Sequence, residues 1–400
     1  MDRRSSRNWF FLTFIILITL HLKVFSIENF DVSLAFLLIP FWTYKTFNIK
    51  TAIFFKKEMI LIFVILIIPF ISVIYVNNWV EFSKTFFQFV ISYFLVARIL
   101  FKPLKINFEI FKKTIFKFQL FLLTVVVIQY VMVVILGQQN FYNLFGDQQL
   151  YYQLPVSLSN FRMKAFYLEP SYLGFIIINL YWIRFHLKPQ NLFGSNFFIT
   201  IILLFFCKSA FAYAAFGLIF LYEFYTNKNF HFGRILKGLS LFIIIILAFL
   251  SFNKLYSFLR LNEISGNSGE ITSGYMRAVL PVEILNQMIL IDGYIFGLPF
   301  GRLEEYIEQF MTGSYSEGSI NNAFFSLIGY WGILAIIFYL FLVFYFFKSK
   351  NKLVKSFILL LLINLNNSGA FVTIQFVFIA FLLPLAAIQI TKNNIQKIKI

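Results

Sequence analysis

Charged residues and cysteines are both scarce in this sequence. Asp, Glu, Lys and Arg make up 13% of the 400 residues, and Cys207 is the only cysteine. One cysteine cannot form an internal disulfide, and no CxxC pair is present to bind zinc, which excludes a disulfide framework and a structural zinc site. The GxxxxGK[ST] and GxGxxG phosphate loops, the HExxH motif and a DxD pair are also absent. We therefore expect no cofactor and no metal, and ATP and metal-bound nucleotide sugars find no support as substrates.

Apolar side chains dominate the chain instead. Hydrophobic residues make up 60% of it and aromatic residues 21%. The polar minority is too small to cover a water-soluble globule, so lipid must be the solvent for most of the chain. The apolar runs predict an all-α polytopic integral membrane protein, one domain over residues 1–400 with about 12 transmembrane helices. The predicted spans are 8–22, 30–44, 59–76, 82–101, 118–136, 170–187, 192–207, 209–225, 235–252, 323–347, 356–366 and 370–390.

The charge pattern predicts how these spans are oriented. The net charge is +17, but the basic residues lie between apolar runs rather than on one soluble face, which argues against nucleic acid as a partner. If the spans alternate, most Lys and Arg fall on one side of the membrane and most Asp and Glu on the other. The positive-inside rule makes the basic side cytoplasmic, so we predict that both termini are cytoplasmic. The run after Arg7 lacks a small-residue cleavage site before Lys23, which favours an uncleaved span over a signal peptide.

The segment 356–366 leaves two possibilities open. It is short and runs into the polar stretch 364–369, so it either crosses the membrane or re-enters it. Only a crossing keeps Lys392, Lys397 and Lys399 on the cytoplasmic side.

Two predicted extracytoplasmic loops, 137–169 and 253–320, are long. Long loops are usually functional or disordered, and the second is too apolar for disorder. Within it, apolar residues recur at helical spacing over 279–289 and 303–311, separated by Gly-Leu-Pro-Phe-Gly at 297–301. We therefore expect a large extracytoplasmic loop with two amphipathic helices on the membrane surface, joined by a hinge-like segment.

The first candidate residues lie at the mouth of the span 170–187. In RMKAFYLEPSY, the basic pair Arg162 and Lys164 precedes Glu169, and Pro170 suits the first turn of a helix. A carboxylate is favoured beside the positive end of a helix, so Glu169 is either an ordinary helix-start residue or a functional group.

Further cations are predicted on the same side of the membrane. Lys208, followed by Ser209, interrupts an apolar run, where it either snorkels to the interface or faces a polar cavity. Arg277 and Arg302 flank the amphipathic segments, and taken singly such arginines are usually solvated or salt-bridged. Cations gathered on an otherwise net negative face indicate an anionic ligand, and the arginine fork matches the phosphate oxygens of a diphosphate.

The three histidines are interpreted differently. His21, His186 and His231 lie near span ends and share no metal-ligand spacing. We interpret them as interfacial residues.

Several stretches in a fixed order carry a family likeness. They are RMKAFYLEPSYLG, CKSAFAYAAFG, GYMRAVLPVEIL followed by GLPFG, and SINNAFFSLIGYWGILA at the start of the next span. Over about residues 160–347 the chain resembles the O-antigen polymerase (Wzy-type) and O-antigen ligase superfamily, with a compatible span count elsewhere.

The resemblance implies a glycosyltransferase of surface-polysaccharide biosynthesis (O-antigen or capsule) in the plasma membrane of a bacterium. Such a polymerase moves the growing glycan from undecaprenyl diphosphate onto the next lipid-linked repeat unit at the outer face. The implied chemistry is inverting and metal-independent. The implied partners are undecaprenyl-diphosphate-linked oligosaccharides, membrane lipids, a chain-length regulator and a flippase.

The superfamily motifs also suggest roles for single residues. By resemblance, Arg162 matches the basic residue ahead of the Glu-Pro-Ser motif, Glu169 its carboxylate, and Arg277 the loop arginine. Lys208 and Ser209 match the polar pair that closes a span. We take Glu169 and Arg277 as the catalytic candidates. The predicted diphosphate-binding residues are Arg162, Lys208 and Arg302, and the other candidates are Ser209, Asn321 and Asn322.

Two alternative functions remain open on the sequence alone. The pair Asn321-Asn322 departs from the His-Asn of ligases and of many polymerases, which counts against a ligase that joins finished glycan to lipid A core or protein. A lipid-linked-oligosaccharide flippase is the alternative from another class. A transporter should place ionisable residues in mid-span and keep its loops short, whereas here most charges lie at span ends and the loop 253–320 is long.

Overall fold

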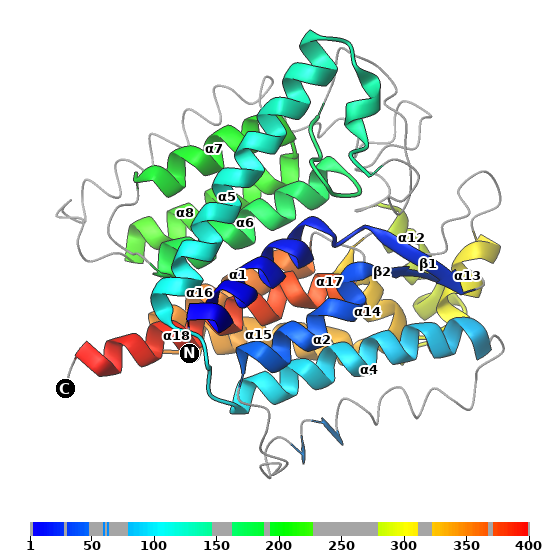
Figure 1. The fold of residues 1–400 in the computed structure, drawn as a ribbon. Coiled ribbons are helices and arrows are strands. Elements are labelled where there is room, and N and C mark those ends of the chain that lie inside the picture. The colour runs from blue at the N-terminus through cyan, green and yellow to red at the C-terminus, as the bar shows by residue number, and fades with distance from the viewer. Residues whose placement is uncertain are drawn as a thin grey trace, which may run out of the picture.

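A computed structural model of the chain is mostly helical, as the sequence predicts (Figure 1). It describes residues 3–27, 30–47, 59–60, 62–63, 79–145, 162–187, 193–226, 279–310, 322–366 and 371–398. The predicted span 235–252 and nearly all of 59–76 lie outside these residues.

The N-terminal part contains a departure from the all-α prediction. Helices α1 (Arg3–Ile18) and α2 (Leu34–Thr46) are joined by strands β1 (Lys23–Ile27) and β2 (Phe30–Ser33). The strands pair antiparallel, with Lys23 opposite Ser33 and Ile27 opposite Phe30. In β2 the apolar Phe30 and Val32 alternate with the polar Asp31 and Ser33, which is the period of two expected for a strand. The hydroxyl of Ser33 then caps α2 by accepting the N–H of Phe36.

The next two helices are long. Helix α4 covers Trp79–Phe101, and α5 covers Phe108–Tyr130 and continues through the π-helical turn Val131–Ile135. Helix α5 begins ten residues before the predicted span 118–136, because Asn107 caps it and Glu109 lies in its first turn beside Lys112, with Nζ and Oε1 2.9 Å apart.

The middle of the chain follows the prediction closely. Helices α6 (Pro170–Leu187), α7 (Ser195–Cys207) and α8 (Ala210–Thr226) begin and end within three residues of the predicted spans. Almost every side chain of α6 is buried, and α6 packs against α5, α7, α8, α16 and α18.

The predicted span 323–347 is broken in two. Helix α14 (Ala323–Trp331) ends at Gly332, and α15 (Ile333–Lys348) begins directly after it. Gly332 has a φ of +53°, and a Cβ there would lie 1.9 Å from the carbonyl oxygen of Ile295. The N–H of Leu298 donates to the carbonyl of Gly329 at 2.8 Å, so the segment predicted as a hinge is docked against the break.

The two amphipathic segments are helical, as predicted. They form α12 (Leu280–Asn286), which continues into a π-helical turn at Gln287–Ile291, and α13 (Arg302–Phe310). Helix α12 packs on α14.

The C-terminal part contains α16 (Lys352–Leu365), α17 (Ile374–Val377), a π-helical turn (Phe378–Leu382) and α18 (Leu383–Ile398). By length and composition, three helices among the described residues could cross a membrane, namely Phe82–Phe101, Phe108–Ile135 and Ile374–Lys392. Helix α15 exposes large apolar side chains along its length, which suits contact with lipid: Ile333, Leu334, Ile337, Leu340, Phe341, Phe344 and Phe347.

The elements define two ends of the molecule. In Figure 1 the start of α1 and the end of α18 lie toward the left, and β1, β2, α12 and α13 lie toward the right. We call the second the hairpin end. The rings of His21 and Tyr172 are in edge-to-face contact with centroids 4.3 Å apart, which places the start of α6 at the hairpin end. At the opposite end, the N–H of Lys105 donates to the carbonyl of Thr46 at 2.9 Å and joins the ends of α2 and α4.

Candidate functional site

The turn between α7 and α8 is tight, as the sequence predicts. Lys208 ends α7 in a left-handed conformation (φ 46°, ψ 41°), and its N–H donates to the carbonyl of Leu204 at 2.9 Å. Its side chain is exposed, so burial of its charge is avoided. The hydroxyl of Ser209 accepts the N–H of Ala212 at 3.4 Å, which gives Ser209 a structural role as the cap of α8.

This turn is packed against the segment that carries Glu169. The N–H of Met163 donates to the carbonyl of Phe206 at 2.9 Å, and the thiol of Cys207 lies 2.9 Å from the carbonyl oxygen of Pro170. A Cβ on Gly174 would lie 2.6 Å from the Cβ of Ala212, so only glycine permits this approach of α6 to α8. The structure thus brings together two predicted groups, Arg162 to Glu169 and Lys208 to Ser209.

Glu169 lies immediately before α6. Its carbonyl accepts the N–H groups of Tyr172 (3.1 Å) and Leu173 (3.2 Å), and its carboxylate accepts the hydroxyl hydrogen bond of Ser171. The side chain is half-buried. Glu169 is therefore a helix-start residue, and it also presents a carboxylate at the positive end of a buried helix.

Lys164 lies in the site but is not among the catalytic or diphosphate-binding residues predicted from the sequence. Its side chain is 1% exposed, and its Nζ donates to the carbonyl of Leu168 at 3.3 Å and lies 4.8 Å from the ring centre of Tyr142. Burial lowers the pKa of Lys164 to about 8, an effect that the nearby charge of Glu169 opposes. The signal was present in the sequence, because Lys164 belongs to the basic pair ahead of Glu169.

Gln129 fixes the backbone that carries Lys164. Its Oε1 accepts the N–H groups of Lys164 (3.3 Å) and Ala165 (2.9 Å), and its Nε2 donates to the carbonyls of Phe141 and Tyr142. Ala165 has a φ of 51°, an uncommon conformation for a residue with a Cβ. A buried glutamine that satisfies four backbone groups explains how this loop is held on α5.

Arg162 lies within electrostatic reach of the same site. Burial raises the pKa of the Tyr142 phenol, and the charge of Arg162 lowers it while that of Glu169 raises it. Both charges also act on the Cys207 thiol. Arg162, Lys164 and Glu169 therefore surround one region between the end of α5, the start of α6 and the α7–α8 turn.

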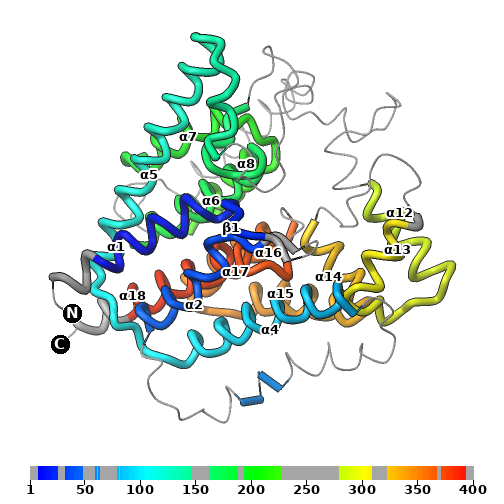
Figure 2. Tube along the Cα trace, turned by 45° about the vertical axis from the view of Figure 1, so that its right-hand side comes forward, coloured from blue at the N-terminus to red at the C-terminus, as the bar shows by residue number. Residues whose placement is uncertain are grey.

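The remaining predicted residues are elsewhere or undescribed. Arg302 begins α13, which lies apart from α7 and α8 in both views (Figures 1 and 2). Asn322 caps α14 by accepting the N–H groups of Phe324 and Phe325, at 3.0 and 3.3 Å. Arg277 and Asn321 lie outside the described residues.

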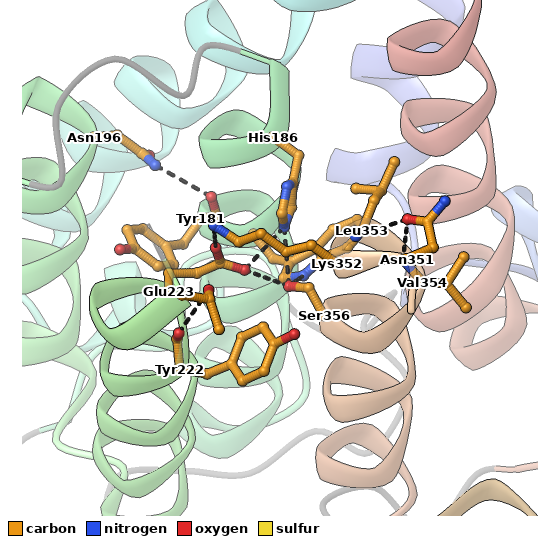
Figure 3. Close-up of polar contacts among 12 residues, drawn as sticks. Tyr181, His186, Asn196, Tyr222, Glu223, Asn351, Lys352, Leu353, Val354 and Ser356 are labelled. Atoms are coloured by element: carbon orange, nitrogen blue, oxygen red, sulfur yellow. Dashed lines mark hydrogen bonds and ion pairs between the residues drawn. The ribbon is translucent and has the colours of Figure 1, made fainter. Parts of the chain in front are cut away.

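A second polar cluster lies where α6 and α8 end and α16 begins (Figure 3). Glu223 is fully buried, accepts a hydrogen bond from the hydroxyl of Ser356, and lies 3.5 Å from Nζ of Lys352. Nε2 of His186 is 3.2 Å from Oε1 of Glu223 and 3.0 Å from Oγ of Ser356. The indole N–H of Trp182 donates to the same Oγ at 2.8 Å.

These residue types match a hydrolase triad, but their geometry does not. In such a triad the serine and the carboxylate bind opposite nitrogens of the imidazole. Here both meet Nε2 of His186, and the single hydroxyl hydrogen of Ser356 goes to Glu223. Nε2 must therefore carry a proton and donate to Glu223. The cluster has a structural role, because its hydrogen bonds join α6, α8 and α16. The sequence predicts an interfacial His186 and gives no sign of these buried partners.

Comparison with known proteins identifies the family. No curated protein and no solved structure matches the chain. The family model of the WcaD colanic acid polymerases matches residues 9–389, which include both polar clusters and nearly all of the described helices. The chain belongs to the WcaD colanic acid polymerase family.

Proposed function

We propose that this polymerase extends a surface polysaccharide by transferring the growing glycan from undecaprenyl diphosphate onto the next lipid-linked repeat unit. The proposal takes the hairpin end to face the outside of the plasma membrane. The family membership supports the polymerase activity. The observation that carries the site is the packing of the segment from Arg162 to Glu169 against the α7–α8 turn.

The proposed reaction is a direct displacement at the anomeric carbon of the donor sugar. The acceptor hydroxyl oxygen forms the new bond, the bond from the anomeric carbon to the diphosphate oxygen breaks, and its electron pair leaves with the diphosphate. One displacement inverts the anomeric centre. Glu169, at the start of α6, accepts the proton of the acceptor hydroxyl as general base.

Fixed cations would stabilise the charge that develops on the leaving diphosphate. Arg162 lies on the Glu169 segment, and Lys208 lies on the turn packed against it. Cations held in place before the reaction stabilise the transition state more than the ground state, because the negative charge grows as the bond breaks. The proposal assigns this charge compensation to side chains and not to a metal ion. Arg277 and Arg302 remain candidates from sequence for the same role.

Deletion of the gene distinguishes the activities. Lipid-linked glycans resolved on a gel should show a single repeat unit on the carrier or core in the deletion strain. Long polymer accumulating on the carrier would identify a ligase, and repeat units confined to the cytoplasmic leaflet would identify a flippase.

Complementation then tests the site. Glu169→Gln and Arg162→Ala should each abolish long polymer at a normal protein level, whereas Glu305→Gln on α13 serves as the matched carboxylate control and should retain it. Full polymer from both site variants would remove the mechanism.

The orientation is checked with Lys208→Cys, which should react with an impermeant thiol reagent added outside intact cells. The native Cys207 is buried and gives a low background.

A further inference from the structure

Lys164 is a buried cation whose hydrogen-bonding capacity is mostly unused. An ammonium group has three N–H donors. In the described part of the chain, Nζ donates to one carbonyl, that of Leu168 at 3.3 Å, and faces the ring of Tyr142. Glu169 acts on Lys164 through its charge, but no ion pair joins them among the described residues. A desolvated charge with spare donors favours a negatively charged partner.

Two more buried polar atoms lie beside it. Nδ1 of His21 and the hydroxyl of Tyr172 have no hydrogen-bond partner among the described residues, and the two side chains are 3% and 7% exposed. Their rings are in edge-to-face contact at 4.3 Å. The charge of Lys164 reaches His21. Buried polar atoms are nearly always paired in folded proteins, so two unpaired atoms beside an underused cation indicate a ligand.

These three residues come from separate elements that meet beside Glu169. His21 follows α1, Lys164 precedes α6, and Tyr172 lies in the first turn of α6. A water molecule or a neutral sugar hydroxyl could accept the spare hydrogen bonds, but neither would compensate the charge of Lys164. An oxyanion does both, because each oxygen accepts charge-assisted hydrogen bonds.

We propose that Lys164, His21 and Tyr172 form a binding subsite for an oxyanion of the lipid-linked substrate. Lys164 supplies the charge, and the hydroxyl of Tyr172 and the ring nitrogen of His21 complete the contacts. The inference rests on the proposed function in taking its ligand from the polymerase substrates. Two substrate groups have this chemistry, namely the diphosphate of the carrier lipid and the carboxylate of an acidic sugar in the repeat unit.

Binding to the purified full-length protein in detergent tests the subsite without requiring turnover. The probes are farnesyl diphosphate, a methyl glucuronide, and farnesol as the uncharged control, each titrated by calorimetry. Lys164→Met should weaken one charged probe about tenfold or more, and Tyr172→Phe should weaken it several-fold, since both remove a bond to a charged group. Lys84→Met, the same change on a half-buried lysine of α4, should leave the affinity unchanged.

The pattern of results identifies the source of the oxyanion. Weakened binding of farnesyl diphosphate assigns the subsite to the carrier diphosphate, and weakened binding of the glucuronide assigns it to a sugar carboxylate. Wild-type affinity for both probes in Lys164→Met would overturn the proposal, as would a wild-type protein that binds neither. If Lys164→Met does not fold, Tyr172→Phe and Lys164→Gln are measured instead. Wild-type affinity for both probes in these two variants would likewise overturn the proposal. The gel assay of the deletion strain reports on the polymerase activity separately, so either idea can fail alone.

Discussion

Gly174→Ala is a direct test of how α6 positions the proposed site. The added Cβ would lie 2.6 Å from Cβ of Ala212 and 3.3 Å from Sγ of Cys207. An ordinary contact needs at least 3.4 Å, so α6 and the α7–α8 turn must move apart by most of an ångström. Overpacking of this kind costs about 1–3 kcal/mol. A displacement of about 1 Å between Glu169 and Lys208 would lower the polymerisation rate by about 10- to 100-fold.

The assay compares polymer length in complemented cells with the thermal midpoint of the purified protein. Gly217→Ala is the matched control, because a Cβ added at Gly217 would have nothing within 4 Å and alanine favours a helix by about 1 kcal/mol. The double variant Gly174→Ala with Ala212→Gly removes the closest clash and should recover much of the activity. Wild-type midpoint and polymer length in Gly174→Ala would refute the argument that close packing sets the site.

Three other perturbations have definite expected outcomes. In the free enzyme the Lys164 ammonium, which Glu169 and Tyr142 face, loses its proton above about pH 8, so kcat/KM should fall above that pH. Lys164→Arg should remove this alkaline fall from the measured range. Glu223→Ala should lower the free energy of unfolding by about 3–5 kcal/mol, measured in denaturant, because it leaves buried partners unpaired, and Glu223→Gln should cost less. Gly332→Ala should prevent normal folding, seen as loss of protein from the membrane fraction, because its Cβ would meet backbone at 1.9 Å; wild-type levels would contradict this.

The sequence predicted the helices around the site well because two strong signals coincide there. Pro170 marks the start of α6, and the Lys208-Ser209 pair marks the turn between α7 and α8. In lipid, every backbone N–H and C=O group must be hydrogen-bonded within a helix. An apolar run interrupted by a polar pair therefore predicts two helices joined by a turn at that pair.

Two features that hydropathy does not reveal made the predictions wrong in places, namely the hairpin and the break in the span 323–347. The hairpin of β1 and β2 depends on strand pairing, and the break at Gly332 depends on a tertiary contact with Ile295. Both residues around the break are apolar, so the run looked continuous. Gly332 follows Trp331 directly, and a glycine beside a bulky aromatic residue gave no local sign that a distant loop docks there.

The importance of Lys164 could not be weighed from sequence either. Arg162 and Lys164 look equivalent as a basic pair, and only burial distinguishes them: Lys164 is 1% exposed, while Arg162 is half-buried. The backbone that carries Lys164 is held by Gln129, which lies more than thirty residues earlier and binds four backbone groups of this region. A contact of that separation has no periodic signature.

Helix α6 links the two polar clusters. Its sequence is almost wholly apolar, but Asn179, Trp182 and His186 recur at spacings of three and four and lie on one face. That face binds α16: the amides of Asn179 and Asn364 exchange hydrogen bonds at 3.1 and 2.9 Å, and Trp182 and His186 share Ser356.

Such a row of polar contacts fixes both the rotation and the axial position of α6. Sliding α6 by one turn, about 5.4 Å, would leave every one of these groups without its partner in a region that offers no water. Apolar packing alone tolerates small shifts of that kind far better than directional hydrogen bonds do. The carboxylate of Glu169 stands at the other end of the same helix, about 26 Å from His186 at 1.5 Å per residue. The axial position of Glu169 is therefore fixed by the hydrogen bonds between α6 and α16. The apolar residues of α6 between Glu169 and these contacts keep the helix rigid.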